Sequence, residues 1–289
     1  LKIPSSTCNL SYFSSETVSF TSASILRKLK TKDVTLVTTT IRKRTIAHVP
    51  ILEVVPKDKI NEALPLIVYY HGWQTNKELA LTAAKKIAQQ NMRVILPDGM
   101  YHGERKVESP TGIPSFRFWS TIQHNFSEFP LIKSFYQKRQ LIEEDKLGVA
   151  GFSMGGMTTA GLLTHFPEIK AAAILMGTPN FQDFVHKVAS YVNQENSYSG
   201  QLLRELVSWN KFFDLSLMPE TLDGRPLYFW HGTEDAKLPF NVTHEFYLAH
   251  KDTAYGKGMS FDIGEGEPHI LTIDTMLKTS DFFHKEFHG

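Results

Sequence analysis

A serine between two glycines is the first feature of this sequence that could do chemistry. The apolar run Leu147–Phe152 leads into residues 151–155, which read GFSMG. A segment of small residues that is typical of a helix follows. A G-x-S-x-G pattern between a strand and a helix is typical of a nucleophile elbow, a sharp turn that exposes the oxygen of Ser153. Both glycines are expected because a Cβ atom would collide inside that turn. A tight strand–helix turn that happens to contain serine is the alternative interpretation.

A serine hydroxyl becomes an effective nucleophile only beside a base, and that base needs an acid to orient it. Asp235 is the candidate acid because it lies in the loop just after the predicted strand Leu227–Trp230. Loops at this end of parallel strands commonly carry reactive groups. Glu234 and Asp183 are rival acids. A loop aspartate that caps the following helix is the alternative interpretation of Asp235.

The candidate base is one of 12 histidines. His269 stands out because a glycine-rich loop carries it between the last predicted strand and the last predicted helix. His71 and His231 each end a strand just before a glycine, and we interpret both as structural residues that shape their loops. Ser153, Asp235 and His269 follow one another in the chain order of the serine, acid and histidine of hydrolase triads.

The chemistry of such a serine also needs N–H donors for the oxyanion of a tetrahedral intermediate. The N–H of Met154, at the start of the predicted helix, is one candidate. The second is the N–H of Trp73, in the loop after the strand Pro65–His71. We expect the rings of Trp73, Phe118 and Trp119 to border the substrate pocket.

The elements that must position these residues alternate between strand and helix, which predicts an α/β fold with a mostly parallel central sheet and helices on both faces. The predicted strands of this sheet are Pro65–His71, Arg93–Pro97, Leu147–Phe152, Ala171–Met176, Leu227–Trp230 and Ser260–Ile263. The predicted helices are Lys77–Asn91, Phe116–Leu141, Met154–His165, Phe240–His250 and Ile270–Phe287.

Three further segments complete the predicted organisation of a single domain over residues 1–289. Val34–Ile41 and His48–Val55 are predicted to pair as an antiparallel hairpin that turns at Arg42–Arg44. Residues 179–220 are too long for a plain crossover connection and contain amphipathic stretches, which predicts a helical lid over the edge of the sheet. Residues 1–30 show no sustained periodicity and are interpreted as an N-terminal extension, and the sequence does not decide whether it is ordered or a mobile tail.

Composition limits the classes of partner. The chain of 289 residues has a net charge of +1 with acids and bases intermixed, which argues against nucleic acid or an anionic membrane as a partner. The single cysteine, Cys8, excludes an internal disulfide and fits a reducing compartment, so we expect a cytoplasmic protein. No apolar run reaches transmembrane length. We expect no metal ion and no cofactor, and a homo-oligomer is one possibility that the sequence leaves open.

Together these segments resemble α/β-hydrolases, and more narrowly the bacterial serine esterase branch related to dienelactone hydrolases and to the catalytic domain of prolyl oligopeptidases. The resemblance covers roughly Pro65 to the end of the chain. It rests on His71-Gly72-Trp73, Pro97-Asp98-Gly99, Tyr101-His102-Gly103-Glu104-Arg105, Gly151-Phe152-Ser153-Met154-Gly155-Gly156, His231-Gly232-Thr233-Glu234-Asp235 and the loop to His269.

The resemblance implies a serine hydrolase with Ser153 as nucleophile, His269 as base and Asp235 as orienting acid. Dienelactone hydrolases carry cysteine at the elbow, so serine here favours ordinary carboxylic esters of small size as substrates. The alternative is a serine peptidase of the prolyl oligopeptidase type that releases short peptide units. Those enzymes carry a large additional domain that a chain of this length does not accommodate. A ligand-binding protein without activity is disfavoured because such proteins usually lack a triad member.

The segment Tyr101–Arg105 resembles a family loop that lies beneath the active site. We expect Glu104 and Arg105 to hold this loop through polar contacts and to take no direct part in catalysis.

Overall fold

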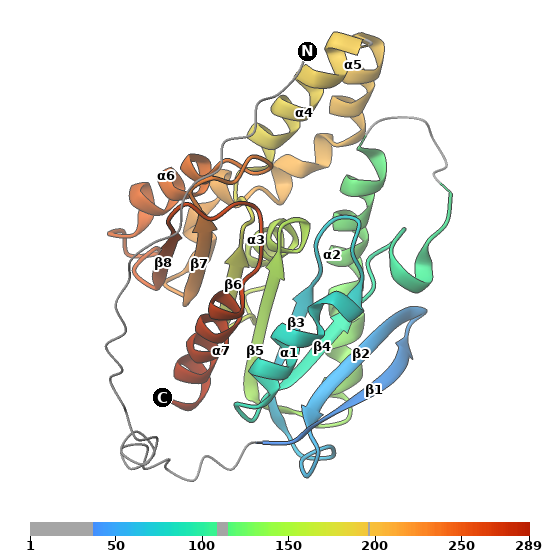
Figure 1. Ribbon diagram of the computed structural model, residues 1–289, viewed down its shortest axis with the longest axis vertical. Coiled ribbons are helices and arrows are strands. Elements are labelled where there is room, and N and C mark those ends of the chain that lie inside the picture. Colours follow the sequence, from blue (N-terminus) through green and yellow to red (C-terminus); the bar gives the residue numbers. More distant parts are fainter. Residues whose placement is uncertain (1–36, 109–114, 196) are drawn as a thin grey trace, which may run out of the picture. The chain divides into compact units, whose positions relative to one another are not determined.

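The computed structural model describes residues 37–108, 115–195 and 197–289 (Figure 1). The predicted N-terminal extension, residues 1–30, and Cys8 lie outside the described residues, so these two interpretations stay predictions. Residues 37–289 form one compact unit.

The centre of the fold is an eight-stranded sheet. Its strands are β1 (Thr39–Ile46), β2 (Val49–Pro56), β3 (Leu64–Tyr70), β4 (Arg93–Pro97), β5 (Ile142–Phe152), β6 (Ala171–Leu175), β7 (Leu227–Gly232) and β8 (Met259–Gly264). They lie in the order β1-β2-β4-β3-β5-β6-β7-β8. The strand β2 runs antiparallel to both β1 and β4, and all neighbours from β4 to β8 are parallel. The sheet is therefore mostly parallel, as predicted.

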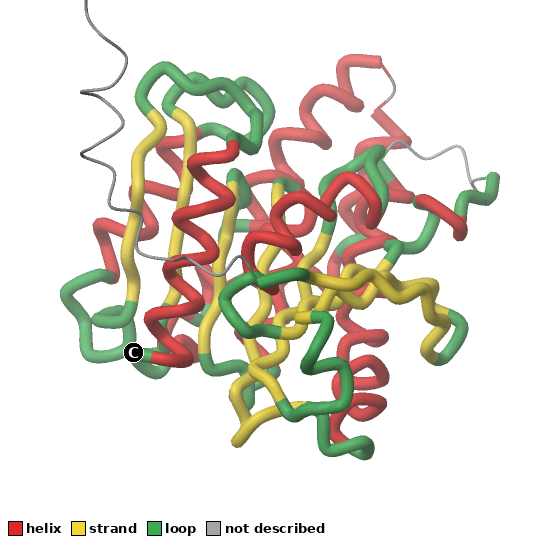
Figure 2. The backbone as a smooth tube through the Cα atoms, turned by 60° about the horizontal axis from the view of Figure 1, so that its bottom comes forward, coloured by secondary structure: helices red, strands yellow, loops and turns green. Residues whose placement is uncertain are grey.

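Helices cover both faces of the sheet (Figure 2). They are α1 (Leu81–Ala88), α2 (Phe116–Gln137), α3 (Met154–His165) and α7 (Ile273–His288). The strand β3 shows why, since its side chains alternate between the two faces and all are buried. Leu66 and Val68 belong to the apolar cluster that contains α2 and α3, whereas Ile67 and Tyr69 belong to the cluster that contains α1 and α7. The predicted α/β fold with helices on both faces of a mostly parallel sheet is confirmed.

The predicted hairpin is present, but its predicted turn at Arg42–Arg44 is wrong. The chain turns at Ala47 and His48, which have φ values of 45° and 64°. Ile46 pairs with Val49 across this two-residue turn. Arg42 and Arg44 instead lie within β1. The Arg44 guanidinium forms an ion pair with the buried carboxylate of Glu53 on β2, at a distance of 2.7 Å. The basic residues that suggested a solvated turn thus form contacts with Glu53 on the neighbouring strand.

The long connection between β6 and β7 is largely helical and extends beyond the ends of the strands (Figure 1). It contains α4 (Phe181–Glu195), α5 (Ser197–Leu206) and three short 3₁₀ helices, Ser208–Phe212, Leu215–Leu217 and Pro219–Leu222. Helices are therefore present where the sequence predicted them, and their role as a lid stays a prediction. Two more 3₁₀ helices, Lys77–Ala80 and Gly103–Arg105, and the helix α6 (Phe240–His250) complete the elements.

Among the residues that the structure describes, no helix has the length and apolar character needed to cross a membrane.

Candidate active site

Ser153 lies in the sharp turn between β5 and α3. Its backbone has φ 57° and ψ −116°, a conformation that a non-glycine residue rarely adopts and that is often found at active sites. A Cβ atom on Gly151 would come 2.2 Å from the backbone of Gly155, and one on Gly155 would come 2.1 Å from the carbonyl oxygen of Tyr70. Both flanking positions therefore require glycine, and the turn matches the geometry of a nucleophile elbow.

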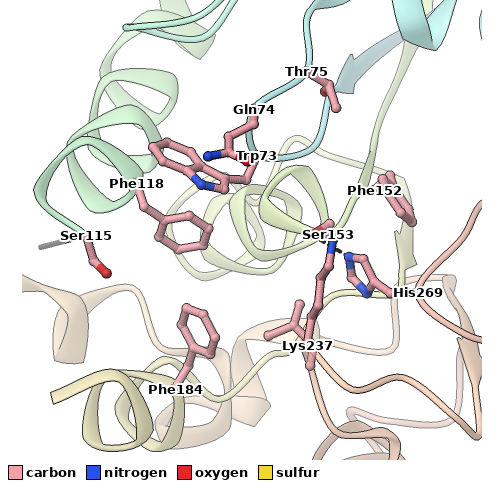
Figure 3. A pocket seen from close by; sticks show the side chains of 11 residues that line it. Trp73, Gln74, Thr75, Ser115, Phe118, Phe152, Ser153, Phe184, Lys237 and His269 are labelled. Carbon is pink, nitrogen blue, oxygen red and sulfur yellow. Dashed lines mark hydrogen bonds between the residues drawn. The ribbon is translucent and has the colours of Figure 1, made fainter. Parts of the chain in front are cut away.

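Three side chains from three loops meet at this turn. The Oγ atom of Ser153 lies 2.8 Å from Nε2 of His269, and Nδ1 of His269 lies 2.6 Å from Oδ2 of Asp235 (Figure 3 shows Ser153 and His269). Because an ionised carboxylate can only accept, Nδ1 of His269 carries the proton. That leaves Nε2 as an acceptor for the serine hydroxyl. Ser153 follows β5, Asp235 follows β7 and His269 follows β8, so all three lie past the carboxyl ends of parallel strands.

The carboxylate of Asp235 is almost fully buried and completely engaged. Oδ1 accepts the backbone N–H groups of Lys237 at 2.8 Å and Leu238 at 2.9 Å. Oδ2 accepts from His269 and also from Nε2 of His231, at 3.1 Å. Burial alone would raise the pKa of Asp235, but the hydrogen bonds from His231, His269 and the Leu238 N–H lower it well below its ordinary value. Asp235 is therefore ionised at neutral pH.

Neither rival acid reaches His269. Glu234 has an exposed side chain, and its N–H donates to the carbonyl of Glu267. Asp183 is exposed in the first turn of α4, where its N–H is capped by the side chain of Asn180.

His231, which the sequence suggested to be a structural residue, contacts the carboxylate of Asp235. Its Nε2 lies 2.9 Å from the carbonyl of Leu238 as well as near Oδ2 of Asp235, so Nε2 carries the proton. The ring is 1% exposed, and within the described residues its Nδ1 has no hydrogen-bond partner. The signal in the sequence was its position four residues before Asp235, after a strand.

The loop that carries His269 is held against the loop that carries Asp235. A Cβ atom on Gly232 would lie 2.2 Å from the carbonyl oxygen of Glu267, so glycine is needed for this close approach. The N–H of Gly266, at φ 68°, donates to Oγ1 of Thr233 at 2.9 Å. These contacts fix how closely the two loops approach, and so help to set the distance between acid and base.

A separate set of contacts orients the peptide that links Gly72 to Trp73. The carbonyl oxygen of Gly72 accepts from Nδ1 of His71 at 2.8 Å, from Oγ1 of Thr75 at 2.7 Å and from the N–H of Thr75 at 3.3 Å. Because a trans peptide is planar, its N–H points opposite to its carbonyl, so anchoring the Gly72 oxygen also fixes the direction of the Trp73 N–H.

His71 can do this only as a neutral ring. Its Nε2 accepts the N–H of Gly99 at 3.0 Å, which assigns the proton to Nδ1. The side chain is 4% exposed, and burial lowers the pKa of His71 to about 4. The residue thereby joins the loop after β3 to the loop after β4.

His102 forms a second pair of hydrogen bonds between the same two loops. Its Nε2 accepts the N–H of Gln74 at 3.2 Å, and its Nδ1 donates to the carbonyl of Met100 at 2.8 Å. Its ring also meets the ring of Trp73 edge-on, with centroids 4.9 Å apart. Burial lowers the pKa of His102, which favours the neutral form that these bonds require.

The loop that carries His102 is itself tied down by charged groups. Asp98 is fully buried and accepts from the Lys77 ammonium at 2.6 Å and from the N–H of Glu104 at 2.9 Å. The Arg105 guanidinium forms a two-point contact with Glu128, at 2.6 Å and 2.8 Å. The prediction that Glu104 and Arg105 hold this loop through polar contacts is confirmed.

A pocket of about 400 Å³ opens over Ser153 (Figure 3). The structure brings the predicted Trp73 and Phe118 to its wall, whereas Trp119 lies behind them, 1% exposed and in edge-to-face contact with Phe118. Its size and its neighbours on α2 and α4 draw the Trp119 ring into the core. The sequence missed several wall residues. The residues that line the pocket are Trp73, Gln74, Thr75, Ser115, Phe118, Phe152, Ser153, Phe184, Lys237, Leu238 and His269.

Across residues 37–108, 115–195 and 197–289, no group of three or more His, Cys, Asp or Glu side chains could hold a metal ion.

The strand order, the elbow and the position of the three side chains are those of one class of protein. The chain belongs to the α/β-hydrolase family, whose model, described as alpha/beta hydrolase fold, matches residues 65–274.

Two bacterial proteins are similar to this chain over most of its length. The chain is 32% identical over 248 residues to the protein YitV of Bacillus subtilis (strain 168), a match that covers 84% of this chain and 97% of YitV. It is 26% identical over 250 residues to "Esterase YjfP" of Escherichia coli (strain K12), covering 85% of this chain and 98% of YjfP.

Among solved structures, TT1662 from Thermus thermophilus shares the fold with a TM-score of 0.69 at 18% identity. That similarity covers 87% of this chain and 99% of TT1662.

Proposed function

We propose that this protein is a serine carboxylesterase that hydrolyses small carboxylic esters through an acyl-enzyme intermediate. The observation that carries the proposal is the hydrogen-bonded series from Ser153 through His269 to Asp235, at the base of a pocket of substrate size. The similarity to a protein named as an esterase supports the choice of esters.

In the proposed reaction, the Ser153 hydroxyl attacks the ester carbonyl while His269 takes its proton at Nε2. Asp235, ionised and held by four donors, stabilises the resulting imidazolium and keeps Nδ1 protonated. His269 then gives its proton to the leaving alcohol as the tetrahedral intermediate collapses. A water molecule attacks the acyl-enzyme by the same route and releases the acid.

The N–H groups of Trp73 and Met154 are the proposed donors to the oxyanion. For Trp73, the support is the triple anchoring of the Gly72 carbonyl, which fixes the N–H on the other side of the same peptide. For Met154, the support is its place as the first residue of α3, where a backbone N–H has no partner within the helix. The positive end of the α3 dipole favours the same negative charge.

The apolar wall of the pocket is the proposed acyl site. Trp73 and Phe118 lie with ring centroids 5.5 Å apart, and Phe118 and Phe184 lie 5.4 Å apart, so the three rings form one continuous surface. Each methylene that the acyl chain buries there contributes ~1 kcal/mol until the volume of the pocket is filled.

A panel of p-nitrophenyl esters of increasing acyl length, beside p-nitroanilides of proline and alanine, tests this function. We expect kcat/KM to rise from acetyl to butyryl or hexanoyl esters and then to fall, because longer chains exceed the pocket. Ester turnover should greatly exceed anilide turnover, since an amide has the poorer leaving group. Faster cleavage of the anilides would replace the esterase with a peptidase, and a preference for long acyl chains would contradict the proposed acyl site.

A further inference from the structure

Lys237 is the only lysine or arginine among the described residues that line the pocket, and no aspartate or glutamate accompanies it there. Its side chain is exposed and runs from the loop after β7 toward Ser153 (Figure 3). Within the described part of the chain, the only hydrogen bond of Lys237 is made by its backbone N–H, and its ammonium group forms no ion pair with a carboxylate. A cation without a partner in a reaction pocket is available to a ligand.

The position of Lys237 assigns it to one side of the pocket. Its N–H is bound to Oδ1 of Asp235 at 2.8 Å, so its side chain starts beside the acid and base of the triad. The aromatic surface of Trp73, Phe118 and Phe184 forms the other side (Figure 3).

Chemistry fixes which part of an ester lies on each side. The base must deliver a proton to the oxygen of the departing alcohol, so the alcohol part has to lie next to His269. The acyl part then lies toward the aromatic rings, where it gains most from burial.

We infer that the natural substrates are esters whose alcohol part carries an anionic group, a carboxylate or a phosphate, and that Lys237 binds this group. The inference rests on the proposed function and adds the chemical class of the leaving group. An ammonium group can approach an anion from many directions, which suits a flexible side chain at the open rim of a pocket. The same contact would hold the alcohol oxygen close to Nε2 of His269.

Matched substrates test this directly. The butyrate ester of meta-hydroxybenzoate carries an anion on the alcohol part, and the same ester of methyl meta-hydroxybenzoate is its neutral counterpart. Phenyl hemisuccinate, compared with phenyl butyrate, carries the anion on the acyl part. Each pair is compared by its ratio of kcat/KM at low ionic strength, after subtraction of spontaneous hydrolysis.

We expect the wild-type protein to prefer the alcohol-side anion by roughly fivefold to tenfold, the effect of one partly solvated ion pair. Lys237→Met should bring this ratio close to one, and Lys237→Arg should restore most of it. The matched control is Lys106→Met, which removes an exposed lysine from a neighbouring hollow that shares the wall of Trp73, Gln74 and Thr75. That variant should keep the wild-type ratio.

Four results would overturn the inference. Two concern the wild-type protein, namely the lack of a preference for the alcohol-side anion and a preference for the acyl-side anion. The other two are an unchanged ratio in Lys237→Met and an equal loss in Lys106→Met, which would indicate that the preference comes from the overall positive charge near the pocket. Labelling of Ser153 by a fluorophosphonate distinguishes a failure of the inference about Lys237 from a failure of the proposed function. Labelling and neutral-ester turnover without an anion preference would overturn the inference alone, whereas failure of both would overturn the proposed function as well.

Discussion

At the scale of single residues, Asp235 is the most constrained functional group of the candidate site. Backbone N–H groups of Lys237 and Leu238 hold one carboxylate oxygen, and the rings of His231 and His269 approach the other. A carboxylate held in this way stays ionised and cannot rotate away from His269. Its environment therefore fits the role of an orienting acid, in which the group stabilises an imidazolium and keeps its own charge.

Asp235→Asn should lower kcat by about 10⁴, because an amide in that position favours the wrong tautomer of His269. The measurement is steady-state turnover of p-nitrophenyl butyrate, with circular dichroism to verify folding. Asp183→Asn and Glu234→Gln are the matched controls, because each neutralises an exposed carboxylate. Glu234 is next to Asp235 in the sequence, and Asp183 follows the neighbouring strand β6. The kcat of each control should stay within a few fold of the wild-type value. If Asp183→Asn were as damaging as Asp235→Asn, the acid would belong after β6.

At the scale of elements, the loops after β3 and β4 are joined by two neutral histidines. His71 links the Gly72 carbonyl to the Gly99 N–H, and His102 links the Gln74 N–H to the Met100 carbonyl. Each bond requires a specific protonation state, because protonation would place a second donor against an N–H group. The direction of the proposed oxyanion donor thus depends on two side chains that themselves need not touch the substrate.

This junction makes stability depend on pH. The folded pKa of His71, about 4, is below the ordinary value of 6.5, so between these values the unfolded chain binds a proton that the folded protein does not. Stability should therefore be constant above about pH 6.5 and fall below it. We expect a loss of about 2 to 3 kcal/mol in the free energy of unfolding from pH 7.5 to 4.5, measured by urea denaturation. His102 shifts in the same direction.

Two variants make that measurement specific. His71→Asn should be less stable at neutral pH and should show a smaller loss on acidification. His48→Asn replaces an exposed histidine in the β1–β2 turn, and it should keep the wild-type pH dependence. An unchanged slope in His71→Asn would contradict the assignment of this pH dependence to His71.

At the scale of the whole molecule, local patterns were sufficient for most of the fold. Apolar runs and helical spacing identified β4, α3 and α6 with their observed bounds, because each is a regular element bordered by clear turn residues. The hairpin turn was misplaced because the arginines of β1 pair with Glu53, a buried residue of the adjacent strand. A contact between two strands cannot be recognised from the local sequence pattern of either strand.

In the candidate active site, too, local sequence patterns predicted some features and tertiary contacts determined the others. The positions of Ser153, Asp235 and His269 could be predicted because each lies just past its own strand, where the topology gathers reactive groups. The contact of His231 with the acid and the place of Lys237 in the pocket depend on how separate loops fold onto one another. Trp119 was expected at the pocket wall, but residues from α4 in the β6–β7 connection enclose it, and that packing is not visible in the sequence.

The central claim is that Ser153 forms the covalent intermediate, and mass spectrometry of the protein after reaction with a fluorophosphonate tests it most directly. We predict one adduct per chain, located by peptide mapping on Ser153, and parallel loss of p-nitrophenyl butyrate turnover. Ser153→Ala should remain folded, take up no label and lose at least about a thousandfold in kcat. An adduct on another residue, or a Ser153→Ala variant that retains more than about a tenth of wild-type activity, would contradict the account.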